Sequence, residues 1–310
     1  MNFWKDSMPE RYNGLVPLLV AASIAIAGLL FFIFLRDPAD PSRDFGTMFD
    51  GQRSLNDVSV QVSFGPRPPG SEAHAQMIDW MVATLTAIGG WELEVQRAEY
   101  NGTEVSNVIA KRGQGPPWIV LGAHYDTRFI ADQDPDQAKR LQPVLGANDG
   151  ASGVAILMEL GRILPRDLDK EIWLVFFDAE DNGRVPGWEW IMGSRAFVQG
   201  LEVYPDAAVI VDMVGDADLN VYQEVSSDAQ LTEEIWGIAG QLGYSDILIP
   251  EHKYTILDDH TPFLEAGIPA VDIIDFDYPF WHTSEDTLDK VSSESLQIVG
   301  NTLLAWLETK

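Results

Sequence analysis

The sequence predicts an α/β domain of three layers, in which a mostly parallel mixed central sheet lies between helices, preceded by one N-terminal transmembrane helix. Short continuous apolar runs at 118–123, 172–177 and 207–211 are typical of strands that are buried on both faces. Segments with helical spacing alternate with these runs, which indicates helices packed on a largely parallel sheet. A longer apolar stretch near the N-terminus predicts the membrane span.

This N-terminal stretch runs from Leu15 to Leu35 and, at about 1.5 Å per residue, reaches roughly the 30 Å of a bilayer core. A cleaved secretory signal is the alternative, but its apolar region is only about 7–15 residues long and ends in small residues. Here the run ends in Phe-Ile-Phe-Leu-Arg-Asp. We therefore expect a tail at 1–14, an anchor at 15–35, a linker rich in Asp, Pro and Ser at 36–51 and a globular domain at 52–310.

The orientation of this anchor is weakly encoded, because two basic residues precede it and two follow it closely. An anchor at the start of the chain, with no later span, most simply leaves the large domain outside the cytoplasm. The expected location is therefore a single-pass membrane protein with an extracytoplasmic domain.

Charge and cysteine content restrict the partners and the metal chemistry. The formal net charge is −28, from 48 acidic and 20 basic residues, which argues against nucleic acid because phosphate contacts need clustered Lys and Arg. The chain has no cysteine, so disulfides and thiolate zinc sites are excluded. Any metal must be bound by histidines and carboxylates.

The elements of the globular domain follow one another with recognisable boundaries. A helix is expected at 71–88 with Ser71 as N-cap, followed by alternating strands at 91–98 and 106–111. The three buried strands come next along the chain. Helical apolar spacing recurs at 153–164, 228–242 and 292–307.

Polar side chains stand where each buried strand stops. His124-Tyr125-Asp126 follows the first strand, Asp178-Ala179-Glu180-Asp181 the second, and Asp212 the third. The carboxyl ends of strands in an open α/β sheet face the ligand crevice, so these groups are expected to converge. With Asp149 and His282 they offer two imidazoles and three metal-binding carboxylates, a set suited to zinc. Taken alone, Asp149 reads equally well as a helix N-cap.

These residues resemble the zinc-dependent M28 peptidases and their relatives, the animal-type glutaminyl cyclases, over about 56–307. The motifs that carry the resemblance are Gly65-Pro66-Arg67-Pro68-Pro69-Gly70-Ser71, His124-Tyr125-Asp126, Asn148-Asp149-Gly150, Glu180-Asp181, Gly193-Ser194-Arg195 and Trp281-His282-Thr283. The resemblance implies the three-layer fold of the zinc aminopeptidases. It also implies peptide or protein N-termini as substrates.

In the peptidases the matching residues bind two zinc ions. This implicates His124, Asp149 and Asp212 at one ion, and Asp149, Asp181 and His282 at the other. In the cyclases the residues matching Asp149, Asp181 and His282 hold a single zinc. Tyr125 and Asp126 are expected to support His124 from behind, because a ligating histidine usually donates its other N–H to a carboxylate or a carbonyl.

Glu180 is implied as the general acid/base in both branches of the family. Its neighbour Asp181 faces the metal, which leaves Glu180 free to carry a proton. In a peptidase it would deprotonate the attacking water. In a cyclase the substrate's own α-amine attacks its γ-carboxamide, and Glu180 would move the proton to the leaving ammonia.

Three features favour the cyclase. The segment between Asp181 and Gly193 carries Trp188 and Trp190 and resembles a cyclase insertion; Trp281 matches the indole that holds the substrate's side-chain carbonyl. Asp258 matches a residue that joins an acidic network with Glu180 and Asp212, and such crowding keeps one proton bound.

Each feature also has a plainer interpretation. The tryptophans of the insertion would equally suit surface packing, Asp258 would suit a helix cap before Thr261-Pro262, and the Trp-His-Thr motif also occurs in peptidases. The chain departs from the animal cyclases in having Asp181 in place of Glu and Asp272 in place of His. His260 is expected to be structural, His252 exposed, and His74 part of the first helix.

The function predicted from the sequence is that of a zinc-dependent glutaminyl-peptide cyclotransferase, which forms N-terminal pyroglutamate and releases ammonia. Its expected catalytic residues are Glu180, Asp258, Asp212 and Trp281. An M28-type aminopeptidase with two zinc ions is the alternative. An inactive, membrane-tethered binding module is a third reading, against which the intact set of ligands argues.

Overall fold

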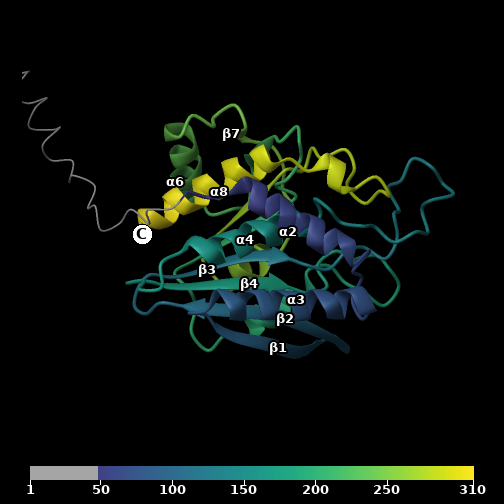
Figure 1. The fold of residues 1–310 in the computed structure, drawn as a ribbon, viewed down its shortest axis with the longest axis horizontal. Helices are drawn as coiled ribbons and strands as arrows, with labels where there is room; N and C mark the ends of the chain where they lie inside the picture. Colours follow the sequence, from purple (N-terminus) through teal and green to yellow (C-terminus); the bar gives the residue numbers. More distant parts are fainter. Residues whose placement is uncertain (1–47) are drawn as a thin grey trace, which may run out of the picture. The chain divides into compact units, whose positions relative to one another are not determined.

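A six-stranded mixed sheet forms the middle layer of the computed structural model, which describes residues 48–310 (Figure 1). The strand order is β1-β2-β4-β3-β5-β8, with β1 and β2 antiparallel, β2 and β4 antiparallel, and the rest parallel. Its strands are β1 (Glu92–Tyr100), β2 (Thr103–Arg112), β3 (Trp118–His124), β4 (Glu171–Phe177), β5 (Ala207–Asp212) and β8 (Ala270–Ile274). A separate parallel pair consists of β6 (Val221–Gln223) and β7 (Leu248–His252).

Helices cover both faces of this sheet, which explains why its central strands are apolar throughout. One face packs against α2 (Gly51–Ser63), α3 (Glu72–Ile88), α4 (Ala151–Ile163), α6 (Ala229–Gln241) and α8 (Ser293–Glu308). The other face packs against α5 (Met192–Gln199) and the short α7 (Thr261–Glu265). Successive residues of β3 enter opposite layers: Leu121 joins the first core and Val120 the second. A 3₁₀ turn, Leu288–Lys290, precedes α8.

The predicted α/β class and its three layers are confirmed, and the strongly periodic elements lie close to their expected positions. The helix predicted at 71–88 is α3, and the Oγ of Ser71 accepts a hydrogen bond from the His74 amide at 3.1 Å, as expected of an N-cap. The three predicted buried strands are β3, β4 and β5, which lie side by side in the sheet.

The domain begins earlier than the predicted boundary at residue 52. Phe49 is buried, and a Cβ on Gly300 of α8 would lie 2.4 Å from its ring, so the glycine leaves the space that the phenyl group fills. Asp50 caps α2 by accepting a hydrogen bond from the Arg53 amide at 2.9 Å. The polar composition that suggested a linker therefore includes the cap of the first described helix.

The expected tail at 1–14, anchor at 15–35 and most of the linker lie outside the described residues. Between residues 48 and 310, no helix is both long enough and apolar enough to cross a membrane. The membrane anchor and the extracytoplasmic location stay predictions from sequence.

Candidate active site

The parallel strands β3, β4 and β5 deliver polar side chains to one edge of the sheet. His124 is the last residue of β3 and pairs in register with Phe177 of β4, and Asp212 is the last residue of β5. Asp149 reaches the same place from the loop before α4, and His282 from the loop after β8. The convergence expected from the sequence is present in the structure.

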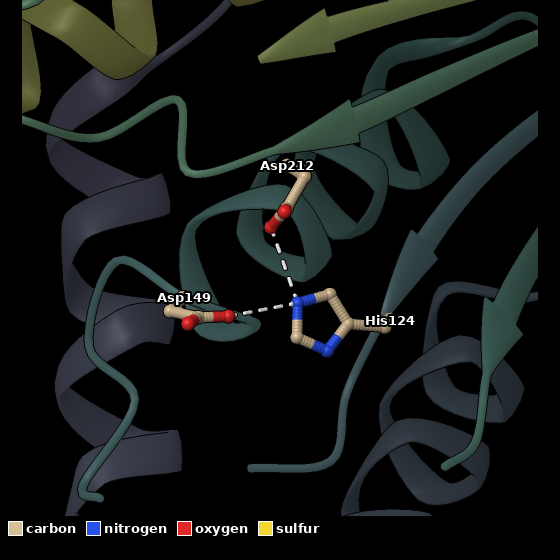
Figure 2. A group of neighbouring side chains, drawn as sticks. All are labelled: His124, Asp149 and Asp212. Atoms are coloured by element: carbon tan, nitrogen blue, oxygen red, sulfur yellow. Dashed lines mark hydrogen bonds and ion pairs between the residues drawn. The ribbon is translucent and has the colours of Figure 1, made fainter. Parts of the chain in front are cut away.

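One cluster, called here the His124 group, consists of His124, Asp149 and Asp212 (Figure 2). The Nε2 of His124 lies 3.1 Å from a carboxylate oxygen of Asp149 and 3.1 Å from one of Asp212. All three side chains are buried. On its other side, the Nδ1 of His124 lies 3.4 Å from the carboxylate of Asp126. Asp126 thus stands where a supporting carboxylate was expected.

The second cluster, the His282 group, consists of Asp149, Asp181 and His282. The Nε2 of His282 lies 2.6 Å from Asp181 Oδ1 and 3.8 Å from Asp149 Oδ2. Within each group the candidate ligand atoms all lie within 4.8 Å of one another. Asp149 belongs to both groups and uses a different oxygen for each imidazole.

The donor atoms of these groups suit a zinc ion. Asp149 Oδ2 and Asp181 Oδ2 are buried and accept no hydrogen bond from the described part of the chain. A buried carboxylate oxygen without a partner is costly, and a divalent cation between carboxylates and imidazoles would satisfy it. Although burial favours its protonated form, the hydrogen bond from His124 keeps the pKa of Asp149 below the usual range. Asp149 is therefore ready to bind a cation.

Asp149 does not cap the following helix, so that interpretation of the sequence is wrong. Helix α4 begins at Ala151 with Gly150 at the cap position and no side-chain cap bond. Gly150 has φ +98°, and a Cβ there would lie 2.8 Å from the carbonyl oxygen of Asp126, so only glycine fits. This tight turn aims the Asp149 carboxylate at His124.

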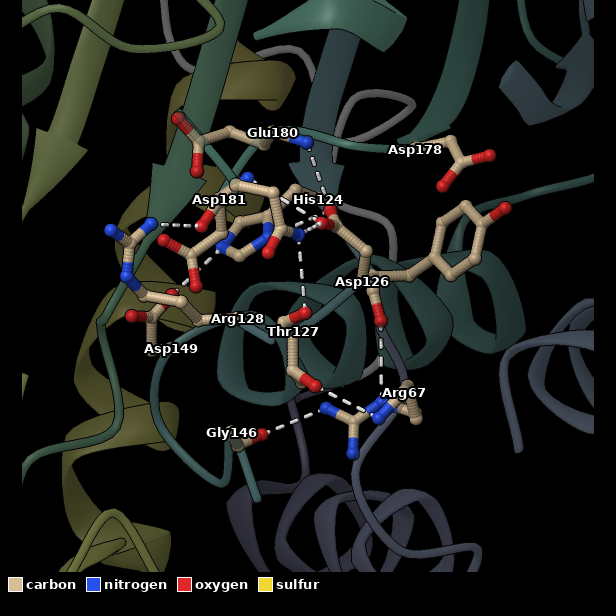
Figure 3. Close-up of polar contacts among 12 residues, drawn as sticks. Arg67, His124, Asp126, Thr127, Arg128, Gly146, Asp149, Asp178, Glu180 and Asp181 are labelled. Carbon is tan, nitrogen blue, oxygen red and sulfur yellow. Dashed lines mark hydrogen bonds and ion pairs between the residues drawn. The ribbon is translucent and has the colours of Figure 1, made fainter. Parts of the chain in front are cut away.

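Glu180 and Asp181 sit on a loop after β4 that Asp126 fixes in place (Figure 3). The Asp126 carboxylate accepts hydrogen bonds from the amides of Glu180 and Asp181 at 3.0 and 3.4 Å, and from the Asn182 side chain at 3.0 Å. While Asp126 binds the backbone amides, the Asp181 side chain contacts His282 and the Glu180 side chain lines a cavity.

Burial raises the pKa of both Asp181 and Glu180, but the neighbouring charges that contribute are different. Burial raises the pKa of Asp181 to about 6, with the charge of Asp149 adding to the shift. Burial raises the pKa of Glu180 well above its usual range; His124 opposes this shift, and the charge of Asp258 reinforces it. A carboxyl group with a raised pKa can both accept and return a proton near neutral pH, as a general acid/base must.

The cavity has a volume of about 230 Å³, and its floor is acidic: Asp149, Glu180, Asp181, Asp212 and Asp258. Its walls include Trp190 and Trp281, whose rings lie nearly parallel to the imidazole of His282, with centroids 5.9 and 3.7 Å away. Trp188 instead packs against Phe129 at 5.2 Å. The two tryptophans of the insertion therefore divide between the cavity and plain surface packing.

Asp258 lies on the cavity floor and does not cap α7 through its side chain. His260 occupies the cap position, and only the backbone carbonyl of Asp258 accepts the Thr261 amide, at 2.8 Å. Burial raises the pKa of Asp212 to about 7, although His124 opposes it, and the charge of Asp258 contributes to the rise. Asp258, Glu180 and Asp212 thus line one cavity, as the sequence suggested.

Asp272 is fully buried on β8, and neither of its oxygens has a hydrogen-bond partner in the described chain. Burial raises its pKa well above the usual range, and the charge of Asp258 adds to this. His260 is buried, with Nδ1 3.6 Å from Asp272 and Nε2 3.4 Å from Glu224, while His252 is exposed. His74 of α3 bonds Asp178 at 2.7 Å.

Arg128 is a supporting residue that sequence reasoning missed. Its guanidinium donates to the backbone carbonyls of Asp181 and Gly183 at 2.7 and 3.2 Å and pairs with Asp132 at 2.8 Å. Asp132 lies 3.6 Å from the Nδ1 of His282. An arginine after a strand looks solvated in sequence, and only tertiary packing reveals its burial.

Asp286 was missed in the same way. Its two oxygens accept the backbone amides of Asn148 and Asp149 at 2.8 and 3.2 Å, and Tyr278 donates its hydroxyl to it at 2.7 Å. Across the site, Arg67 of the Gly-Pro-Arg-Pro motif donates to the carbonyls of Tyr125 and Gly146 (Figure 3). The only hint in the sequence was that Asp286 lies four residues after the expected ligand His282.

Comparison with known proteins places this site in a family of enzymes. Residues 107–307 match peptidase family M28, and since this is well over half of the chain, the chain belongs to that family. Bovine glutaminyl-peptide cyclotransferase-like protein is 26% identical over 262 residues, which span 71% of this chain and 66% of the bovine protein. The matched region thus covers just under two thirds of that relative.

Solved structures named as a glutaminyl cyclase and as an aminopeptidase both superpose on this chain. The glutaminyl cyclase of Tannerella forsythia has a TM-score of 0.78 at 32% identity, covering 85% of this chain and 100% of that one. A leucine aminopeptidase precursor from Bacteroides thetaiotaomicron has a TM-score of 0.79 at 31% identity, covering 85% and 98%. Fold similarity alone therefore does not separate a cyclase from an aminopeptidase.

Proposed function

We propose that this chain is a zinc-dependent glutaminyl-peptide cyclotransferase, which converts an N-terminal glutamine into pyroglutamate and releases ammonia. The observation that carries the proposal is the small cavity in which Glu180 faces the His282 group while Trp190 and Trp281 form the walls. Relatives that are named as glutaminyl cyclases, in sequence and in structure, support it.

Asp149, Asp181 and His282 would hold the zinc ion. When bound, zinc supplies a Lewis acid that polarises a carbonyl group. Asp126 and Arg128 hold the backbone around Asp181, so the ligand is positioned before substrate arrives. Asp181 is one methylene shorter than the glutamate of the animal cyclases, and its 2.6 Å contact with His282 brings the carboxylate to the site nonetheless.

The reaction needs a proton carrier, and Glu180 is placed for this. The α-amine nitrogen of the substrate forms a bond to its own side-chain carbonyl carbon, and Glu180 accepts the proton that the amine loses. Glu180 then returns the proton to the amide nitrogen as the C–N bond breaks, and ammonia leaves. Burial, reinforced by the charge of Asp258, raises the pKa of Glu180, which suits a group that must both accept and return a proton.

The walls of the cavity would hold the side chain of a substrate in place. Trp190 and Trp281 present flat apolar surfaces to a side chain that enters beside His282. Gly183 has no side chain, and a Cβ there would lie 2.1 Å from the Trp190 ring, so the loop lets the indole lie flat. A substrate enclosed in this way has its amine and its carboxamide held together.

An aminopeptidase is the second candidate, and the His124 group favours it. His124, Asp149 and Asp212 are compact enough to hold another ion, and Asp149 would be shared between the two. In that case Glu180 would take a proton from water, and the products would be a free amino acid and a shortened peptide.

The test is to incubate the zinc-loaded protein with an amidated peptide that begins with glutamine. Mass spectrometry should show a full-length product that has lost one ammonia, and a coupled assay should detect that ammonia. The Glu180→Gln variant is the matched control and should leave the peptide unchanged. Free glutamine together with a shortened peptide would reject the cyclase in favour of the aminopeptidase.

A further inference from the structure

The mouth of the cavity differs chemically from its floor. The lining residues that are exposed are Arg184, Thr255, Leu257 and Phe276, of which Leu257 is 51% and Phe276 37% exposed. The acids of the floor are all buried. When the first residue of a peptide reaches the floor, the residues that follow it therefore lie next to these four side chains.

The volume of the cavity indicates how much of a peptide it holds. About 230 Å³ lies below the roughly 300–1,000 Å³ of pockets that enclose drug-sized ligands. The cavity thus accepts one residue, and the second and third residues of a substrate lie at the mouth. Side chains at the mouth decide which sequences are bound well.

Arg184 is held at this mouth by its backbone while its side chain is free. It has φ +65°, in a turn closed by a hydrogen bond from the Val185 amide to the Asn182 carbonyl at 3.2 Å. Arg128 holds the preceding carbonyl, that of Gly183, at 3.2 Å. Within residues 48–310 the Arg184 guanidinium makes no hydrogen bond or ion pair.

Arg184 is the single basic residue among the described residues that line the cavity. Every other ionisable residue that lines the cavity is a carboxylic acid, and each of these is buried at the floor. The chain carries a net charge of −28, which by itself repels acidic peptides. An exposed guanidinium without a partner offers a planar fork that matches a carboxylate.

We infer that Arg184 is a specificity-determining residue that binds a carboxylate side chain in the second or third residue of the substrate peptide. Leu257 and Phe276, which line the same cavity and are exposed, supply apolar contact with the peptide. The inference rests on the proposed function in one respect, that a peptide N-terminus enters the cavity. It adds the class of sequence that follows the N-terminal residue.

The test compares amidated peptides that begin with glutamine and carry aspartate or asparagine at position two or three. In the wild type, kcat/KM should be higher for the aspartate peptides. Arg184→Gln should lower it about two- to fivefold for them, through KM, and leave the asparagine peptides almost unchanged. The Arg184→Gln variant should then prefer the asparagine peptides, because the net negative charge of the chain repels the aspartate peptides. Arg97→Gln, at an exposed arginine of β1 away from the cavity, is the matched control.

The same peptides should be titrated by calorimetry against the Glu180→Gln protein with and without Arg184→Gln, which measures binding without turnover. Selective binding of aspartate peptides that depends on Arg184 would support the inference. If the protein with Glu180 intact then failed to cyclise the same peptides, only the proposed activity would be rejected. An equal effect of Arg184→Gln on both peptide types, or none on either, would overturn the inference even if cyclisation proceeds.

Discussion

The His124 group and the His282 group share Asp149 and have the same kinds of ligand atoms, yet their surroundings differ. His282 lies beside two indoles, and its partner Asp181 is tied down through Arg128. His124 lies between Asp126 and two carboxylates, one of which, Asp212, has a pKa of about 7 because of burial and crowding by Asp258. We propose that the His282 group meets the substrate and that the His124 group decides whether a second ion binds.

Replacing the shared ligand should have the largest effect. Asp149→Ala removes a ligand atom from both groups, so we expect bound zinc to fall to background and turnover to vanish. Zinc is measured by elemental analysis after dialysis. Asp167→Ala, at an exposed acid, is the control and should keep its zinc. Full zinc content in Asp149→Ala would mean that neither group is the metal site.

Glu180→Gln should abolish turnover and leave zinc in place. The substitution keeps the shape of the side chain but removes its ability to accept a proton, which costs about 10²–10⁴-fold in kcat. Steady-state rates and zinc content are measured on the same sample. Loss of zinc from this variant would show that Glu180, and not only Asp181, binds the metal.

The two groups are separated by a matched pair of substitutions. For a cyclase, Asp181→Asn should lose zinc, because Asp181 belongs to the His282 group, while Asp212→Asn should keep the same zinc content as the wild type. Elemental analysis of both variants decides this. A drop of zinc to half in Asp212→Asn would assign an ion to the His124 group and favour the aminopeptidase.

Trp190→Ala tests the aromatic side of the His282 group and should have the smallest effect. Loss of one wall weakens substrate binding, so KM should rise about two- to tenfold with a smaller change in kcat. Trp188→Ala, whose indole packs on Phe129, is the control. If both variants raised KM equally, Trp190 would not contact the substrate, and the insertion would affect binding only by packing on the domain.

Much of this site was predictable because the residues that follow buried strands must meet at one sheet edge. That rule located His124, Glu180, Asp181 and Asp212 without any structure. It could not locate groups whose role depends on burial. Arg128 looks like a solvated arginine in the sequence. The family resemblance assigns Asp149 as a ligand, but taken alone it suits a helix cap equally well until the turn at Gly150 is seen.

The limits of the domain show the same contrast. The helices α3, α6 and α8 carry strong apolar spacing and matched their expected positions closely. The start of the fold was misplaced, because Phe49 is a single apolar residue in a polar stretch and only its packing over Gly300 assigns it to the core. Helices with periodic apolar residues are therefore predictable from sequence, whereas the packing of a single residue such as Phe49 requires the structure.

The most direct test of the central claim is to titrate zinc into metal-depleted protein while following ammonia release from a glutamine peptide. The rate should saturate at one zinc per chain, bound by the His282 group, with no free glutamine formed. A rate that needs two zinc ions per chain and yields free glutamine would contradict it.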